Sequence, residues 1–338
     1  MAAKLEDVAR QAGVSTASVS RVLADKPHVS PAVRQRVMTA IEALNFQPNR
    51  VARSLRTQHA QVIGLLIPDI RNPFFAALVR AVEDIARQHH YSLLLCNVDE
   101  NPEKETSYID LMVAEKVAGV IISPTRETDN SCKRLAEVGI PLVAIDRRTL
   151  KSQTDTVVVD NVTATFELIT HLIDDGHTQI GIVLGVPAAT TGHERRAGYV
   201  KALEARQLPI LSELIWSGPP TVETGYRLVN ELLDLPAPPT ALFMGNSLLA
   251  MGALQAIQER GLQIPTDMAL VAFDEMEWMR IMQPALTSIA QPIYEMGKTA
   301  AELLLARLAD SSRPPQEVML QATLHVRQSC AKHAKVKG

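Results

Sequence analysis

From residue 61 onward, short and almost entirely apolar runs alternate with segments of amphipathic helical pattern. The apolar runs are residues 62–67, 93–96, 120–122, 142–145, 157–159, 180–184, 241–244 and 270–273. Near-continuous apolar strands separated by helices are typical of parallel sheets that helices cover on both faces. This part spans about 270 residues, too many for one small sheet. We therefore expect an α/β core of two doubly wound subdomains.

The first 45 residues carry a different pattern, which predicts three short helices. The first helix covers residues 5–12 and is closed by Gly13, which tolerates the left-handed conformation at a helix end. The second, over residues 16–24, is capped by Ser15, and the third begins at Ser30 and Pro31 and ends near residue 44. Two helices joined by a tight turn and braced by a third form the helix-turn-helix pattern.

The charge of the chain is unevenly distributed. Residues 1–60 hold nine Lys/Arg and four Asp/Glu, giving +5, whereas the remaining 25 Lys/Arg and 33 Asp/Glu give −8. A basic head on an acidic body favours a polyanionic partner for the head, although a basic face that only meets solvent is the alternative.

The second helix carries the predicted DNA face, opposite apolar Val19 and Val22. A recognition helix places its first turns in the major groove, where an arginine can donate two hydrogen bonds to guanine. Arg21 is therefore the candidate base reader, and the serine and threonine hydroxyls suit phosphates. The predicted contact residues of this helix and its cap are Ser15, Thr16, Ala17, Ser18, Ser20 and Arg21.

Polar residues follow several of the predicted strands directly. In open parallel sheets, ligands bind at the carboxyl ends of the strands, where loops and helix N-termini meet. Carboxylates and amides beside arginine suit the hydroxyls of a sugar, and aromatic rings can stack on its apolar face. Each Asp or Asn has a simpler alternative role as a helix cap, but together they predict a ligand pocket. The candidates are Asp69, Asn72, Phe74, Phe75, Asp146, Arg147, Arg195, Asn246, Asp274 and Gln291.

Five colinear motifs resemble the lactose/galactose repressor (LacI/GalR) family of bacterial transcription regulators. They are LEDVARQAGVSTASVSRVL, IGLLIPDIRNPFF, ERRAGY, LVAFDE and LTSIAQP, and they cover nearly the whole chain. The resemblance implies a repressor with a helix-turn-helix head and a hinge helix that orders on operator DNA. It also implies a core similar to periplasmic sugar-binding proteins, which dimerises and binds an effector between two subdomains.

The resemblance also implies domain limits. The head occupies residues 1–47, the hinge helix and linker 48–60, the core 61–330 and a tail 331–338. Within the core, the N-subdomain covers about 61–160 and 291–320, and the C-subdomain about 161–290 and 321–330. In the hinge, Arg50 and Arg53 would contact DNA, and Leu55 would wedge into the minor groove as apolar side chains can. A plain amphipathic linker is the alternative for this segment.

The candidate pocket residues other than Asp69 match positions that contact sugar in ribose-binding members of the wider superfamily. This match implies ribose or a similar small sugar as effector. Two departures from the family pattern stand against it: Ser247 follows Asn246 where the family has Asp, and Pro220 replaces a pocket aromatic. A sugar acid, its carboxylate balanced by Arg147 and Arg195, is the alternative effector.

Other classes of protein fit the sequence less well. It has neither a membrane-length apolar run nor the apolar core of a signal peptide near its start, which predicts a cytoplasmic protein. Three scattered cysteines predict neither disulfides nor a metal site, and no nucleotide-binding or nucleophile motif is complete, so we expect no enzyme, cofactor or metal. The expected partners are palindromic operator DNA, a small sugar or sugar-acid effector and a second copy of the chain. A sugar-binding protein without DNA function is the rival, and the basic head argues against it.

Overall fold

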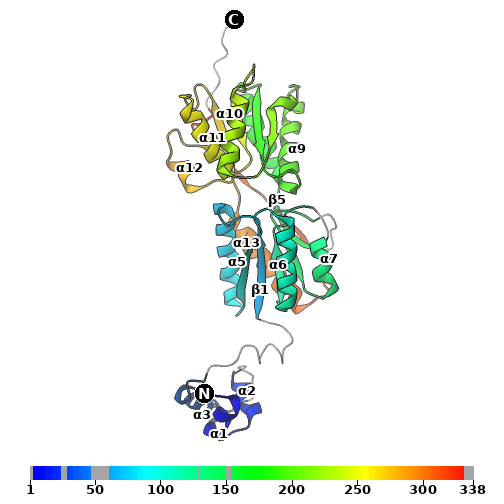
Figure 1. Ribbon diagram of the computed structural model, residues 1–338, viewed down its shortest axis with the longest axis vertical. Helices are drawn as coiled ribbons and strands as arrows, with labels where there is room; N and C mark the ends of the chain where they lie inside the picture. Colours follow the sequence, from blue (N-terminus) through cyan, green and yellow to red (C-terminus); the bar gives the residue numbers. More distant parts are fainter. Residues whose placement is uncertain (1–2, 24–28, 47–60, 128–129, 150–153, 331–338) are drawn as a thin grey trace. The chain divides into compact units, whose positions relative to one another are not determined.

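The computed structural model describes residues 3–23, 29–46, 61–127, 130–149 and 154–330 (Figure 1). The chain forms two compact units, Met1–Ala60 and Gln61–Gly338. We call them the head and the core and describe each by itself.

The head is built from three helices, α1 (Leu5–Ala12), α2 (Thr16–Leu23) and α3 (Pro31–Ala43). Gly13 ends α1 with a left-handed φ of 63°, and the Ser15 hydroxyl accepts the Ser18 N–H at 3.2 Å, so the short turn and the cap are as predicted. One buried cluster, which includes Val8, Val19 and Val37, holds the three helices together. The predicted helix-turn-helix is confirmed.

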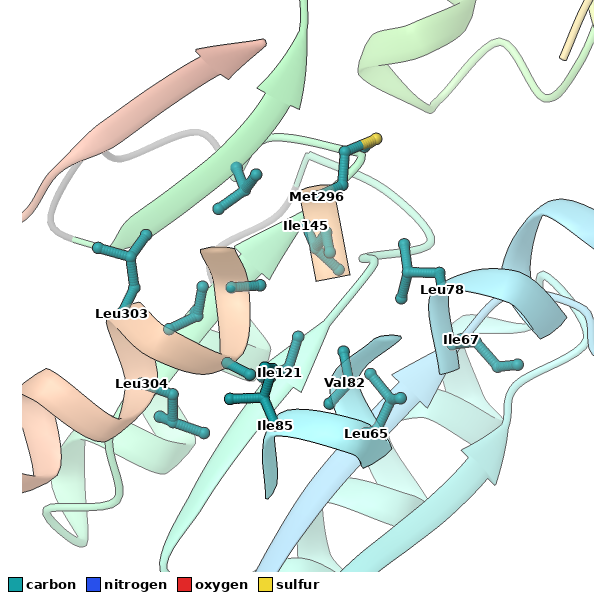
Figure 2. Close-up of a cluster of buried hydrophobic side chains, with 14 of the residues drawn as sticks. Leu65, Ile67, Leu78, Val82, Ile85, Ile121, Ile145, Met296, Leu303 and Leu304 are labelled. Carbon is teal, nitrogen blue, oxygen red and sulfur yellow. The ribbon is translucent and has the colours of Figure 1, made fainter. Parts of the chain in front are cut away.

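The first sheet of the core has six parallel strands in the order β11-β5-β4-β3-β1-β2. Its strands are β1 (Val62–Ile67), β2 (Ser92–Asn97), β3 (Gly119–Ile122), β4 (Leu142–Ile145), β5 (Asp155–Val159) and β11 (Glu317–Leu320). Helices α5 (Pro73–Gln88) and α13 (Ile293–Ala309) cover one face, and α6 (Pro102–Ala114) and α7 (Asn130–Glu137) cover the other. Figure 2 shows side chains of α5 and α13, such as Leu78 and Leu304, gathered around Ile121 and Ile145 of the sheet.

The second sheet repeats this arrangement in the order β12-β10-β9-β8-β6-β7, with β12 antiparallel to β10. Its strands are β6 (Ile180–Leu184), β7 (Ile215–Ser217), β8 (Ala241–Met244), β9 (Ala269–Phe273), β10 (Thr287–Ala290) and β12 (Thr323–His325). Helices α8 (Asn161–Asp174) and α9 (Thr190–Ala205) lie on one face, and α10 (Val222–Leu233) and α11 (Ser247–Glu259) on the other. Two short helices, η1 (Ser212–Leu214) and α12 (Glu277–Ile281), complete this part.

The chain passes between the two sheets three times, after β5, after β10 and after β11. We call the part built on β1–β5 and β11 the first half of the core, and the part built on β6–β10 and β12 the second half. Because the strand order is the same in both, β4 and β9 occupy equivalent positions, and the residues that follow them can be compared directly.

The predicted fold class, a helix-turn-helix head and a doubly wound α/β core, is confirmed. Four predicted strands have the observed bounds, namely β1, β4, β6 and β8. Strands β7, β10, β11 and β12 were not among the predicted apolar runs. Among the described helices, none has the length and apolarity needed to cross a membrane.

Candidate functional site

The predicted DNA face of the head lies on the outer side of α2. Thr16, Ala17 and Arg21 are exposed, and Ser18 and Ser20 are half-buried, while Val19 and Val22 are buried beneath them. The Ser18 hydroxyl lies 3.0 Å from that of Ser15, which leaves the start of the helix lined with hydroxyls. The three predicted hinge contacts, Arg50, Arg53 and Leu55, lie outside the described residues.

The core contains a pocket to which both halves contribute side chains. From the first half it is lined by Asp69, Asn72, Phe74, Phe75, Glu100, Asp146 and Arg147. From the second half it is lined by Gly185, Val186, Thr191, Gly192, Arg195, Pro220, Gly245, Asn246 and Asp274. Asp69 and eight of the nine residues that the resemblance implied therefore meet here. The ninth, Gln291, is not a lining residue but donates to Asp274 Oδ1 at 2.5 Å.

Two asparagines serve as helix caps at the pocket wall. Asn72 Oδ1 accepts the Phe74 N–H at 3.0 Å at the start of α5, and Asn246 Oδ1 accepts the Leu249 N–H at 2.8 Å at the start of α11. Each cap uses the amide oxygen, so each Nδ2 is left as a donor for a ligand. The alternative role of these residues as caps is thus real, and it is compatible with ligand binding.

Asp146 and Asp274 occupy equivalent places at the ends of β4 and β9. Both have left-handed backbones, with φ of 67° and 66°, and both are buried. Burial raises the pKa of Asp146 to about 6, although Arg147 and Arg195 oppose the shift. Burial also raises the pKa of Asp274, against the opposing effects of Arg195 and Gln291. The pocket therefore holds two carboxyl groups whose pKa values burial raises.

Arg147 is fixed within the first half. Its Nη1 and Nη2 donate to the two carboxylate oxygens of Glu100 at 2.8 and 2.6 Å, and Nη1 also donates to the Pro124 carbonyl at 3.2 Å. Burial opposes the charged form, but the charge and hydrogen bonds of Glu100, followed by the charge of Asp146, outweigh it and raise the pKa of Arg147.

Arg195 comes from α9 in the second half and is held mainly by neutral groups. Its Nε donates to Asn161 Oδ1 at 3.0 Å, and its Nη1 donates to the Gly245 carbonyl. The guanidinium carbon lies 3.7 Å from the centre of the Phe273 ring, and Nη2 lies 3.9 Å from Asp274 Oδ1. Burial lowers the pKa of Arg195 despite the carboxylates near it.

Phe74 and Phe75 form an apolar wall at the start of α5. Their rings meet edge to face, with centres 5.0 Å apart and planes at 82°. Both residues are buried and belong to the hydrophobic cluster of the first half. A pocket with an apolar wall, amide donors and carboxylate acceptors suits a small ligand that carries several hydroxyls.

Comparison with known proteins agrees with this arrangement. Residues 4–49 match the model of bacterial regulatory proteins of the lacI family, and residues 60–328 match that of periplasmic binding proteins and the sugar-binding domain of the LacI family. The chain belongs to the LacI family of bacterial regulatory proteins. It is a DNA-binding transcription regulator, so the prediction that it is not an enzyme is confirmed.

Three relatives illustrate the range of this family. Catabolite control protein A of Priestia megaterium is 35% identical over 324 residues, covering 96% of this chain and 98% of that protein. The structure of the Lac repressor dimer bound to operator and the anti-inducer ONPF aligns over 98% of this chain and 100% of that one, with a TM-score of 0.87 and 26% identity. A LacI-family regulator from Enterococcus faecium with bound ribose aligns over 80% of this chain and 99% of that one, with a TM-score of 0.72 and 31% identity.

Some residues of this LacI-family pocket escaped the sequence prediction. Glu100 and Thr191 line it, and neither was among the candidates. The strand-end rule could have found Glu100, because it follows β2, but the direction of its side chain depends on the left-handed backbone of Asp99 and Glu100. Of the two departures from the family pattern, Pro220 does line the pocket. The hydroxyl of Ser247 is buried and has no hydrogen-bond partner in the described part of the chain.

Proposed function

We propose that this LacI-family regulator represses genes of carbohydrate breakdown, and that a small sugar or sugar acid bound in the core pocket changes its affinity for operator DNA. A DNA-binding regulator acts where the chromosome lies, so its place is the bacterial cytoplasm. The observation that carries the proposal is the pocket itself, which gathers amide donors, carboxylate acceptors and an apolar wall from both halves of the core.

Ligand binding between the halves gives a route to the DNA head. A ligand that contacts Asp146 in the first half and Asp274 in the second is bound best when the halves are close together. Its binding energy therefore favours one arrangement of the halves, and the same energy appears as a coupling between effector and DNA. Residues 48–60 join head to core and are the proposed hinge through which this coupling acts.

The regulator is proposed to act as a homodimer. Two heads read two half-sites of a palindromic operator, so affinity depends on the distance and orientation between the heads. The Lac repressor structure that aligns with nearly the whole chain is a dimer bound to its operator, which supports the same assembly here.

Base reading by Arg21 tests the DNA part of the proposal. An operator is first selected with the full-length protein from a pool of random DNA. Because a bidentate contact to guanine discriminates by about 1–3 kcal/mol, Arg21→Ala should weaken operator binding by about 5- to 150-fold and random DNA binding much less. Arg10→Ala, which removes one exposed charge from α1 of the same head, is the matched control and should affect both DNAs alike. Equal losses for Arg21→Ala on both DNAs would make Arg21 a phosphate contact.

A ligand screen tests the effector part. Neutral pentoses and hexoses and their sugar acids are screened by thermal shift, because a ligand that binds only the folded protein raises its melting temperature. Each hit is then titrated into the protein–operator complex. Asp274→Ala should keep operator affinity and lose the response. A response that survives in this variant would place the effector outside the pocket.

A further inference from the structure

An unusual turn brings Glu100 into the pocket. In the turn of residues 98–101, the Asn101 N–H donates to the Val98 carbonyl at 2.9 Å, and Asp99 and Glu100 both have left-handed backbones with φ of 53° and 54°. Left-handed backbone is common for Gly and tolerated by Asp, but it is unfavourable for Glu. Such local strain is retained where the surrounding structure fixes it, and it is concentrated at functional sites.

The turn is anchored by residues that do not line the pocket. The Asp99 carboxylate accepts hydrogen bonds from Asn97 Nδ2 at 2.6 Å and Lys104 Nζ at 2.5 Å, and the Glu100 N–H donates to the Pro68 carbonyl at 3.1 Å. These contacts hold the backbone, so the Glu100 side chain has a defined direction. It ends on the Arg147 guanidinium with two hydrogen bonds, a bidentate pair that is largely buried on both sides.

The pair leaves little positive charge for a ligand. The lining holds four carboxylates, Asp69, Glu100, Asp146 and Asp274, against the guanidiniums of Arg147 and Arg195. Among the described residues, Asp69 has a further cationic partner, the exposed Arg71, whose Nη2 lies 2.8 Å from its carboxylate, whereas the other three carboxylates form ion pairs only with the two pocket arginines. The buried carboxylate of Glu105 adds more negative charge near Arg147. A carboxylate or phosphate on a ligand would enter a site that is already negative, and Glu100 holds the arginine fork that such a group would need.

We propose that Glu100 makes the pocket select uncharged, polyhydroxylated effectors and reject the corresponding sugar acids. The proposal rests on the effector site proposed above and narrows its ligand class. Hydroxyl groups both donate and accept, so they can use the carboxylates of Asp146 and Asp274 and the spare amide nitrogens of Asn72 and Asn246 without displacing Glu100. A sugar acid must break the Glu100–Arg147 pair or leave its own charge unmatched.

The test compares ligands that differ by one carboxylate. D-glucose is paired with D-glucuronate, and D-galactose with D-galacturonate, because each acid keeps the pyranose ring of its partner, and each binding constant is measured by calorimetry on the full-length protein. In the wild type, the acid of a pair should bind at least about 100-fold more weakly than its neutral partner, because like charges repel strongly in a buried site. Glu100→Gln keeps the length of the side chain and removes its charge. It should improve acid binding by about tenfold or more and change neutral binding by less than about threefold.

Two further variants keep the test decisive. Glu103→Gln removes an exposed carboxylate of α6 that does not line the pocket, and it should leave both ligands of a pair unchanged. The double variant Glu100→Gln/Arg147→Gln removes both charges of the pair, so it avoids an unmatched buried arginine, and it should lose the gain in acid binding. Melting temperature and operator affinity without ligand report whether each variant folds.

The outcomes separate the two proposals. The role of Glu100 is overturned if the wild type binds the acid as tightly as its neutral partner, or if Glu100→Gln changes both binding constants by the same factor. Either result leaves the effector pocket itself in place. A protein whose melting temperature and operator affinity respond to no carbohydrate of either class overturns the proposed function, and the role of Glu100 with it.

Discussion

The two halves of the core each place one buried arginine in the pocket, and the two arginines are held in opposite ways. Arg147 of the first half is gripped by the carboxylate of Glu100, and its pKa is raised. Arg195 of the second half donates to Asn161 Oδ1 and a backbone carbonyl, stacks on Phe273, and has a lowered pKa. The same chemical group is therefore hydrogen-bonded to a carboxylate in one half and to neutral acceptors in the other, where the nearest carboxylate, that of Asp274, lies 3.9 Å away.

Because their partners differ, Arg147 and Arg195 are expected to have different roles. A matched ion pair is a fixed structural element, which costs free energy to break and offers little to a ligand. Arg195 donates to neutral acceptors, and the Asp274 carboxylate lies 3.9 Å from its Nη2, beyond hydrogen-bond distance, so ligand hydroxyls compete for Arg195 more easily than for Arg147. The comparison therefore predicts that Arg147 matters more for folding and Arg195 more for ligand response.

The largest expected effect comes from removing each arginine in turn. Arg147→Met leaves Glu100 and Asp146 without their buried counter-ion and should lower the free energy of unfolding by about 3–5 kcal/mol. Arg195→Met leaves mainly neutral acceptors unpaired and should cost about 1–3 kcal/mol. Urea unfolding followed by circular dichroism measures both. Arg80→Met, on the exposed face of α5, is the control and should change little. Equal losses of unfolding free energy in Arg147→Met and Arg195→Met would show that the two arginines contribute equally to folding, against the prediction.

The strands and turns that position the two arginines and their partners could be predicted from the sequence to different extents. Strands β4 and β9 are continuous apolar runs, and the polar residues directly after them, Asp146 and Asp274, were identified by that position alone. The strand-end rule works because parallel strands end at one edge of a sheet whatever the details of packing. The same reasoning predicted that Arg147 and Arg195 lie in one pocket, but it did not show which hydrogen-bond partners each would have.

What the sequence could not predict depends on contacts between distant residues. The ion pair between Glu100 and Arg147 joins residues that are 47 positions apart in the sequence. It depends on the left-handed backbone of Asp99 and Glu100, and the turn sequence VDEN contains no glycine from which such a backbone could be predicted. Strands β11 and β12 are edge strands with mixed burial, so their pattern is not apolar enough to recognise. In β10, Thr287 and Ser288 are buried polar residues. The Thr287 hydroxyl accepts the Arg327 N–H at 2.8 Å, and the Ser288 hydroxyl accepts from Arg327 Nη1 at 3.1 Å. Because these partners lie far along the chain, the two polar residues interrupt the apolar pattern from which a buried strand is predicted.

The second effect, of intermediate size, is a dependence of ligand affinity on pH. Asp146 has a pKa raised to about 6, although the positive charge of Arg147 lies beside it. In the empty pocket, acidification from about pH 7 to pH 5 protonates this carboxyl. Ligand hydroxyls that donate to the ionised form lower its pKa, so binding releases a proton. Affinity for a neutral sugar should therefore fall about tenfold between pH 7 and pH 5.

Two substitutions locate this pH dependence. Asp146→Asn should weaken binding at pH 7 and flatten the profile between pH 5 and pH 7. Asp274→Asn removes the equivalent carboxyl of the second half and should leave the dependence on Asp146 in place. Calorimetric titrations in buffers of different ionisation enthalpy measure the released proton directly. Stronger binding at low pH would show that the ligand accepts a hydrogen bond from protonated Asp146 instead.

The smallest expected effect concerns the residue next to Arg147, which reaches across to the other half. The Arg148 guanidinium binds Glu194 of α9 in the second half and Glu317 of β11 in the first, the latter at 2.9 Å. Glu194 in turn accepts from Asn161 Nδ2 at 2.8 Å, and the other end of that amide binds Arg195. A chain of polar contacts thus connects Arg148 of the first half with Arg195 of the second.

Breaking this chain at Glu194 should loosen the link between the halves without removing any lining group. Glu194→Gln should weaken effector binding by about two- to fivefold, the size of a partly exposed ion pair, because the halves lose part of what holds them together. Raising salt from about 0.05 to 0.5 M screens such a pair, so wild-type affinity should fall towards that of the variant. Glu317→Gln removes the partner of Arg148 within its own half and should leave affinity and its salt dependence nearly unchanged. A larger loss in Glu317→Gln than in Glu194→Gln would mean that Arg148 stabilises the first half alone and that the two arginines of the pocket are coupled only through the ligand.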